Sequence, residues 1–224
     1  VQAAIGSKDP VEETKWLEEI YSNYEIPNAI VGHVDLRADN AREVIEKHLI
    51  YPHFKGIRDF SYGNYLVNDD FRSGFKLHEE YGLISSIAAR WDEMDNLADL
   101  AKSFPNITIV LDHAGNPDFR TKEYFKNWLE GMNKISNLEN IICKISGLGM
   151  GDHNWTIDSI KPYVYSCLEL FGFERSIFAT NWPVDSLYSS YKKVIESYKK
   201  LTEDFSKSES ELFFYKNSER IYNI

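Results

Sequence analysis

The hydrophobic residues of this 224-residue chain follow two alternating patterns. Short, nearly continuous apolar runs are typical of strands buried on both faces, and longer stretches with apolar residues every three or four positions are typical of amphipathic helices. The predicted strands lie at residues 1–5, 26–36, 54–60, 83–89, 108–113, 140–147 and 175–183. The predicted helices lie at residues 11–24, 40–50, 69–81, 92–103, 122–135, 163–171, 188–201 and 209–221. This alternation predicts an α/β protein with a parallel sheet, in a single domain over residues 1–224.

Polar residues follow most of the predicted strands and help to choose between two parallel architectures. A doubly wound nucleotide-binding sheet carries a glycine-rich loop after an early strand, and no G-x-G-x-x-G or Walker pattern follows any strand here. A (β/α)8 TIM-type barrel collects polar residues at the carboxyl ends of many strands. Such residues are Asp35, Arg37, Arg58, Asp59, Arg90, Asp112, His113, Lys144, Ser146, Asn181 and Asp185. The pattern therefore favours a barrel.

A complete barrel has eight strands, and the pattern gives seven. The chain opens at Val1, inside an apolar run and without an initiator Met. We therefore expect the first strand of the barrel to be missing from this chain, so that the domain over residues 1–224 is incomplete at its N-terminus.

The run Thr108–Pro117 is the clearest of the strand ends. Its β-branched residues stop at Asp112 and His113, and Gly115 and Pro117 follow as turn residues. Because successive side chains of a strand point to opposite faces, we expect only one of the two polar residues at the barrel mouth. We assign that place to His113, and we expect Asp112 to point away as a structural, hydrogen-bonding acid.

Composition narrows the possible partners and location. The net charge of −10 argues against a nucleic-acid footprint, which needs clustered Lys and Arg. No stretch reaches the roughly 18–20 apolar residues of a membrane span. Cys143 and Cys167 have no metal-ligand spacing around them and are predicted to be buried thiols. We therefore expect a cytoplasmic protein with a small-molecule substrate, and a homo-oligomer is compatible with the sequence.

Five motifs together resemble a known family. They are His33-Val-Asp-Leu-Arg37, Phe54-Lys-Gly-Ile-Arg58, Val110-Leu-Asp-His-Ala-Gly-Asn-Pro117, Cys143-Lys-Ile-Ser-Gly147 and Phe178-Ala-Thr-Asn-Trp-Pro-Val-Asp185. In this order and spacing they resemble the amidohydrolase-related family (amidohydrolase 2 type). Within it, they are similar to the sugar-lactonase branch, to which L-fucono-lactonases and 2-pyrone-4,6-dicarboxylate lactonase are related.

The resemblance implies a (β/α)8 barrel of the amidohydrolase superfamily that hydrolyses a lactone or another cyclic ester. Carried over from the family motifs, His113, Arg58 and Lys144 face the pocket, as does the acid of the last strand.

Two departures from the family pattern bear on the chemistry. The family begins with a strand carrying His-x-His, which supplies two ligands of the superfamily's divalent-metal site and would lie before Val1. Many relatives also have Asp directly before the last-strand Trp-Pro, where this chain has Asn181. An amide cannot act as a base near neutral pH. Asp185, four residues on, matches a variant of the motif and is the alternative acid.

Lactone hydrolysis needs a base for the attacking water and an electrophilic group at the carbonyl oxygen. We predict that His113 polarises the carbonyl or relays a proton. Asp185 is the candidate general base, with capping of the following helix as the alternative. Asn181 is predicted to donate a hydrogen bond to the substrate, with a plain turn residue as the alternative.

Three further residues are predicted to bind the substrate. Arg58 offers a planar guanidinium to a carboxylate or hydroxyl groups, with an ion pair to Asp59 or another barrel acid as the alternative. Lys144 lies between apolar strand neighbours, so its side chain points into the barrel and needs a partner there. Trp182 offers an apolar platform for a sugar ring, with simple packing as the alternative.

The sequence therefore predicts a hydrolase that opens a small cyclic ester, foremost a sugar (aldono-) lactone. A sugar lactone is an activated ester, so a divalent metal such as zinc is optional for the reaction. The alternatives are a metal-dependent amidohydrolase or decarboxylase of the same superfamily, and a non-catalytic barrel remnant that serves as a binding domain.

Overall fold

The computed structural model describes residues 1, 8–61 and 63–224. Its strands are β1 (Ile30–His33), β2 (Phe54–Arg58), β3 (Ile84–Ile87), β4 (Ile109–Leu111), β5 (Ile141–Ile145) and β6 (Ser176–Phe178). Its helices are α1 (Val11–Tyr24), α2 (Ala41–His48), α3 (Asp69–Phe75), α4 (Leu77–Tyr81), α5 (Met94–Ser103), α6 (Lys122–Ser136), α7 (Ile157–Phe171), α8 (Tyr191–Leu201), α9 (Lys207–Glu211) and α10 (Asn217–Tyr222). Apart from Val1, the strand predicted at residues 1–5 lies outside the described residues.

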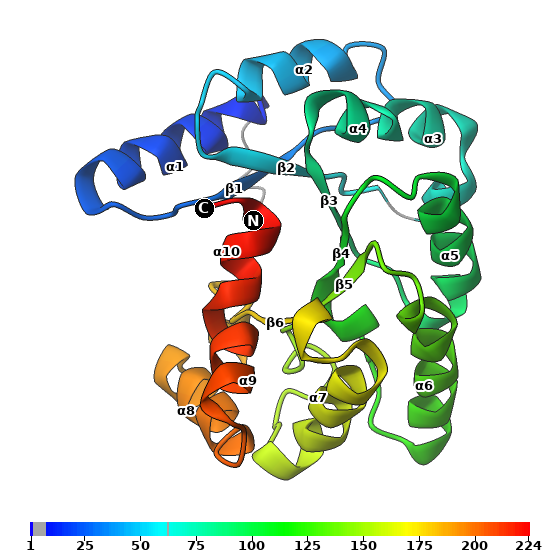
Figure 1. Ribbon diagram of the computed structural model, residues 1–224, viewed down its shortest axis with the longest axis vertical. Helices are drawn as coiled ribbons and strands as arrows, with labels where there is room; N and C mark the ends of the chain where they lie inside the picture. Colours follow the sequence, from blue (N-terminus) through cyan, green and yellow to red (C-terminus); the bar gives the residue numbers. More distant parts are fainter. Residues whose placement is uncertain (2–7, 62) are drawn as a thin grey trace.

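The six described strands form one sheet in the order of the sequence, β1-β2-β3-β4-β5-β6, and every pair is parallel. Helices connect the strands and lie around the outside of the sheet (Figure 1). This arrangement confirms the predicted α/β barrel class, and the strand count is compatible with part of a (β/α)8 barrel. Among the described residues, every helix is too short or too polar to cross a membrane.

Helix boundaries differ from the prediction where capping outweighs hydrophobic spacing. Helix α7 begins six residues before the predicted start at Tyr163, because Thr156 and Ser159 form a capping box at its N-terminus. The predicted helix at residues 209–221 is continuous but irregular, with a π-helical segment at Leu212–Lys216 between α9 and α10. The π turn changes the register of the helix. Both this segment and α10 contact β6.

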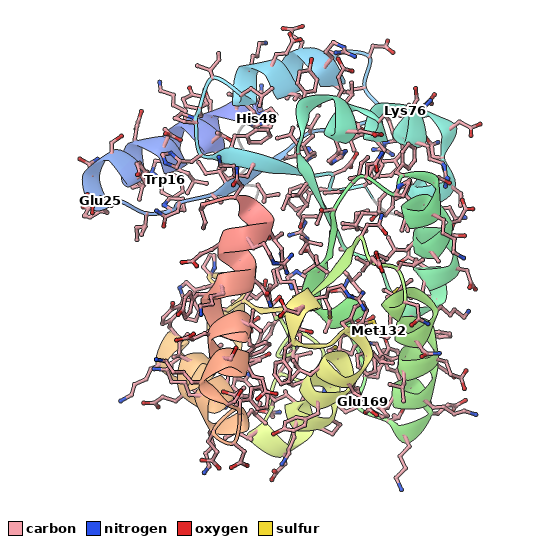
Figure 2. All side chains as sticks on the ribbon, viewed as in Figure 1. Trp16, Glu25, His48, Lys76, Met132 and Glu169 are labelled. Carbon is pink, nitrogen blue, oxygen red and sulfur yellow. The ribbon has the colours of Figure 1, made fainter. Side chains whose placement is uncertain are left out.

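Two apolar clusters hold the fold together. The larger one lies between the sheet and its helices and includes Trp128 and Met132 of α6, both fully buried; Met132 is labelled in Figure 2. The smaller one consists of one residue from each of five strands and faces the opposite side of the sheet: Val31, Ile84, Val110, Ile142 and Ile177. Ile221 and Tyr222 of α10 pack against it. We call these five strand residues the inner apolar layer.

Helices α1 and α2 are attached to the sheet through a buried histidine. His48 of α2, labelled in Figure 2, lies 2.8 Å (Nδ1) from the hydroxyl of Thr14 on α1. Its Nε2 lies 3.1 Å from the carbonyl oxygen of His33 on β1. A carbonyl only accepts, so Nε2 carries the proton and Nδ1 accepts from Thr14. This histidine therefore has a structural role.

Candidate active site

Charged and hydroxyl side chains form a second layer next to the inner apolar layer. Two residues after Ile84, Val110 and Ile142 come Ser86, Asp112 and Lys144, so each polar side chain lies on the same face as its apolar predecessor. On β2, the same spacing leads from Gly56, which pairs with Val31, to Arg58. The polar layer therefore lies at the carboxyl ends of four adjacent parallel strands.

Asp112 is the centre of this layer. Its carboxylate is fully buried, with Lys144 Nζ 2.6 Å from Oδ1 and Arg58 Nε 3.4 Å from Oδ2. The hydroxyl of Ser86 also donates to Oδ1, at 2.8 Å. Burial alone would raise the pKa of Asp112, but the positive charges of Lys144 and Arg58 hold it well below its usual range. A buried carboxylate thus holds two cations together.

This placement corrects the expectation that Asp112 points away from the site. Strand β4 ends at Leu111, and a 3-10 turn over Asp112–Gly115 follows. His113 and Ala114 have left-handed backbone conformations, with φ of 53° and 51°. Asp112 keeps the inward face of Val110, and the left-handed turn brings His113 to the same site. The turn is held by the Trp128 indole, which donates to the carbonyl of Ala114 at 2.8 Å.

His113 is buried beside the cations. Its Nδ1 lies 3.0 Å from the hydroxyl of Ser146, just beyond β5. Burial lowers the pKa of His113 to about 4; the charge of Asp112 opposes this shift, and Lys144 and Arg58 add to it. The imidazole is therefore neutral at pH 7, which leaves it able to accept a proton through one ring nitrogen.

A cavity of about 500 Å³ lies over this layer. Five of the six predicted site residues line it together: Arg58, His113, Lys144, Asn181 and Trp182. The guanidinium of Arg58 stands 4.6 Å from the ring centre of Phe60, which also lines the cavity. The Trp182 ring is 42% exposed and makes an edge contact with Tyr191. The cavity thus joins an aromatic rim to a cationic wall.

Asp185 is the sixth predicted residue, and it stands apart from the cavity lining. Its carboxylate is 4% exposed and accepts a 2.7 Å hydrogen bond from the side-chain amide of Asn181. The alternative interpretation, a cap for the following helix, is wrong, because Ser190 caps α8 by accepting from the backbone N–H of Lys193. Its role as a general base stays a prediction, with Asn181 lying between its carboxylate and the cavity.

Arg58 and Lys144 both have the buried acid as a partner, rather than Asp59. Asp59 instead accepts from the backbone N–H groups of Leu36 and Ser61. The ion pairs hold Arg58 and Lys144 at one carboxylate, and both residues also line the cavity. Pairing therefore positions these cations without excluding a binding role.

A divalent metal does not fit the described residues. Residues 1, 8–61 and 63–224 contain no group of three or more His, Cys, Asp and Glu side chains arranged to hold a metal ion. The acid nearest to His113 is Asp112, whose carboxylate already contacts two cations. No step of the chemistry considered below is therefore assigned to a metal.

Sequence reasoning did not single out Ser86, and it placed Asp112 and Ser146 among the polar strand ends without a role for Asp112 as the organiser or for the Ser146 hydroxyl. The signal for Ser86 and Asp112 is present as the spacing of two residues from Ile84 and Val110, once those are recognised as inward-facing. The same spacing of two residues leads from Lys144 to Ser146, just before Gly147.

Parallel strands covered by helices, with their polar ends gathered around one cavity, define the class of α/β barrels that carry catalytic residues at the carboxyl ends of the strands. The chain belongs to the amidohydrolase family, whose model matches residues 15–224.

Three relatives illustrate the likeness. The uncharacterized protein y4mH of Sinorhizobium fredii is 35% identical over 96% of this chain and 76% of its own length. The L-fucono-1,5-lactonase of Burkholderia ambifaria is 28% identical over 82% of this chain and 64% of its own length. A crystal structure of an amidohydrolase from Burkholderia multivorans with bound zinc has a TM-score of 0.87 and 22% identity, and covers 95% of this chain and 79% of that one. The chain thus spans about two thirds to four fifths of the length of these relatives.

Proposed function

We propose that this protein hydrolyses a small cyclic ester and that its substrate is a sugar (aldono-) lactone. The observation that carries the proposal is the gathering of Arg58, Lys144 and a neutral His113 on one wall of a cavity. The likeness to proteins named L-fucono-1,5-lactonase supports the substrate class. The cytoplasm stays our expectation for where the protein acts, because Cys143 and Cys167 are buried free thiols.

In the proposed reaction, water attacks the carbonyl carbon, the ring C–O bond breaks, and a hydroxy acid is released. Negative charge develops on the carbonyl oxygen during the attack, and a nearby cation stabilises it. Lys144 and Arg58 supply positive charge at the cavity wall, and Asp112 keeps both in place. The cations therefore serve as the electrophilic side of the site.

His113 serves as the proton carrier in this proposal. Its Nδ1 is engaged by Ser146, and no hydrogen bond from the described residues engages its Nε2. Because the ring is neutral at pH 7, Nε2 accepts the proton of the attacking water when Nδ1–H donates to the Ser146 oxygen. The protonated imidazole then gives the proton to the lactone oxygen that leaves when the C–O bond breaks.

The test is a panel of aldono-lactones assayed with the wild type and with His113→Asn, after subtraction of the spontaneous rate. We expect kcat of the variant to fall by about 10²-fold or more, in the range of a lost general acid–base group. His53→Asn is the matched control, because His53 pairs with Glu18 away from the cavity. Equal hydrolysis by wild type and His113→Asn would overturn the catalytic assignment, and no hydrolysis of any lactone by the wild type would overturn the substrate class.

A further inference from the structure

A short turn after β6 joins the cavity to a buried carboxylate. Asn181 lines the cavity and has a left-handed backbone conformation, with φ of 55°. Its carbonyl accepts from the backbone N–H of Asp185 at 3.1 Å, and its side-chain Nδ2 donates to Asp185 Oδ1 at 2.7 Å. The two residues are therefore connected through both backbone and side chain.

Asp185 itself is firmly held. It lies in the 3-10 turn Val184–Leu187, and its carbonyl accepts from the backbone N–H groups of Tyr188 and Ser189, both at 3.0 Å. Its side chain is 4% exposed. The carboxylate is therefore held in one place, and its hydrogen bond holds the Asn181 side chain as well.

The amide of Asn181 has one nitrogen and one oxygen, and its partner decides which of them faces the cavity. An ionised carboxylate accepts hydrogen bonds and donates none, so the NH2 group of Asn181 must face Asp185. We propose that Asp185 is a positioning residue that holds the Asn181 amide oxygen toward the cavity, where it accepts a hydrogen bond from a substrate hydroxyl. The sequence predicted that Asn181 donates to the substrate, and this proposal reverses its role.

Hydrogen-bond donors surround Asp185, and donors stabilise the ionised form that this role needs. A small cavity of about 10 Å³ behind the site is lined by Asp185, Tyr198 and Trp155. The Tyr198 hydroxyl and the Trp155 indole N–H are buried there without a partner among the described residues. Both groups can donate a hydrogen bond, and both line the same small cavity as the carboxylate. Burial raises the pKa of Asp185, and the bond from Asn181 opposes that shift.

The position of Asn181 also brings it next to His113. A Cβ placed on Gly147 would lie 2.8 Å from His113 Nδ1 and 3.1 Å from Asn181 Nδ2, so both side chains border the same glycine. A substrate held over His113 therefore also meets Asn181. The part of the inference that concerns substrate hydroxyls rests on the proposed function, whereas the orientation of the amide does not.

The orientation is tested first, by a measurement that needs no substrate. In ¹⁵N-labelled protein, the side-chain NH2 signals of Asn181 are identified by their loss in Asn181→Ala, and their hydrogen exchange is measured. We expect exchange to speed up at least tenfold in Asp185→Ala. Asp204→Asn is the control, because Asp204 is an exposed acid remote from the cavity lining. Unchanged exchange in a folded Asp185→Ala protein would overturn the proposal.

The role in binding is tested by a double-mutant cycle with the best lactone of the panel. We expect Asn181→Ala and Asp185→Ala each to raise KM about tenfold with a smaller change in kcat, and the double variant to be no worse than Asn181→Ala alone. If the KM increases of the two single variants multiply in the double variant, the positioning role is overturned. In that case Asp185→Ala weakens binding by a route that does not depend on Asn181. Should the single variants not fold, Asp185→Asn replaces Asp185→Ala; its amide can also donate, so it frees Asn181 to turn over. If no lactone is hydrolysed, the exchange experiment still decides the orientation, and only the proposed function fails.

Discussion

Lys144 Nζ lies 2.6 Å from Asp112 Oδ1 at the centre of the polar layer, where both side chains are almost fully buried. Arg58 contacts the other oxygen of the same carboxylate. Two cations around one buried anion leave the cluster with a net positive charge beneath the cavity, which suits the proposed stabilisation of negative charge on a substrate oxygen.

Asp112→Asn should be strongly destabilising. Removing one partner of a buried pair leaves the others charged and unpaired, which typically costs about 3–5 kcal/mol. We expect a loss of about 3 kcal/mol or more in the free energy of unfolding, measured by urea denaturation. Asp35→Asn is the control, because its ion pair with Arg37 is exposed and should cost less than about 1 kcal/mol. Similar small losses in both variants would contradict a cluster organised by Asp112.

Gly147→Ala should damage activity more than stability. Gly147 has φ of 63°, and a Cβ there would come within 2.8 Å of His113 Nδ1. Displacing a reacting group by about 1 Å can cost roughly 10²-fold in rate, so we expect kcat/KM for the lactone to fall by about that factor. Gly82→Ala separates strain from displacement, because Gly82 has φ of 64° and nothing within 4 Å of its Cβ position. It should cost about 1 kcal/mol of stability and leave kcat/KM unchanged.

Arg58→Lys should weaken binding rather than folding. Lysine keeps the charge but loses the planar fork and its stacking over Phe60. We expect KM for the lactone to rise about tenfold, with the free energy of unfolding changed by less than about 1 kcal/mol. Steady-state kinetics beside urea denaturation measure the two effects. Arg37→Lys, an exposed arginine outside the cavity lining, should change neither. An unchanged KM in Arg58→Lys would exclude bidentate binding by Arg58.

Acidification should destabilise the protein between about pH 6.5 and pH 4, because two buried histidines take up protons there only on unfolding. Burial lowers the pKa of His78 to about 4, as it does for His113, whereas an unfolded histidine titrates near 6.5. Between these values the unfolded state binds more protons, so the free energy of unfolding falls as the pH drops from about 6.5 to 4 and is unaffected above that window.

Each of the two histidines should contribute up to about 3 kcal/mol to this loss. The measurement is urea denaturation at pH 7 and pH 4.5. His78→Asn removes one titrating group and should reduce the loss by about 2 kcal/mol relative to wild type. Asn154→Ala, which changes an exposed residue without a titrating group, is the control and should leave the pH dependence as it is. A His78→Asn protein with the full wild-type pH dependence would contradict a buried neutral His78.

The class of fold was predictable because apolar runs and amphipathic stretches alternate without interruption. The gathering of Arg58, His113 and Lys144 was also predictable, since parallel strands bring their carboxyl ends to one edge of the sheet. The inward direction of Lys144 followed from strand alternation, and its buried partner supports it.

That Asp112 and His113 both reach the site was not predictable from alternation, which sends neighbouring side chains to opposite faces. His113 adopts a left-handed conformation that non-glycine residues seldom take, and sequence spacing does not reveal it. The burial of Asp185 behind Asn181 likewise depends on the turn after β6, where backbone hydrogen bonds set the direction of the side chain. Local backbone geometry therefore decided both cases.

The inner apolar layer separates packing from chemistry along the strands that contribute to it. The residues of this layer pack against one another, and after Ile84, Val110 and Ile142 the polar layer begins two positions further along. Substitutions in the polar layer can consequently replace one polar side chain by another while the inner apolar layer, which packs the sheet, stays intact. For a designer, this makes positions 58, 144 and 179 the places to change what the barrel recognises, because these three residues line the cavity.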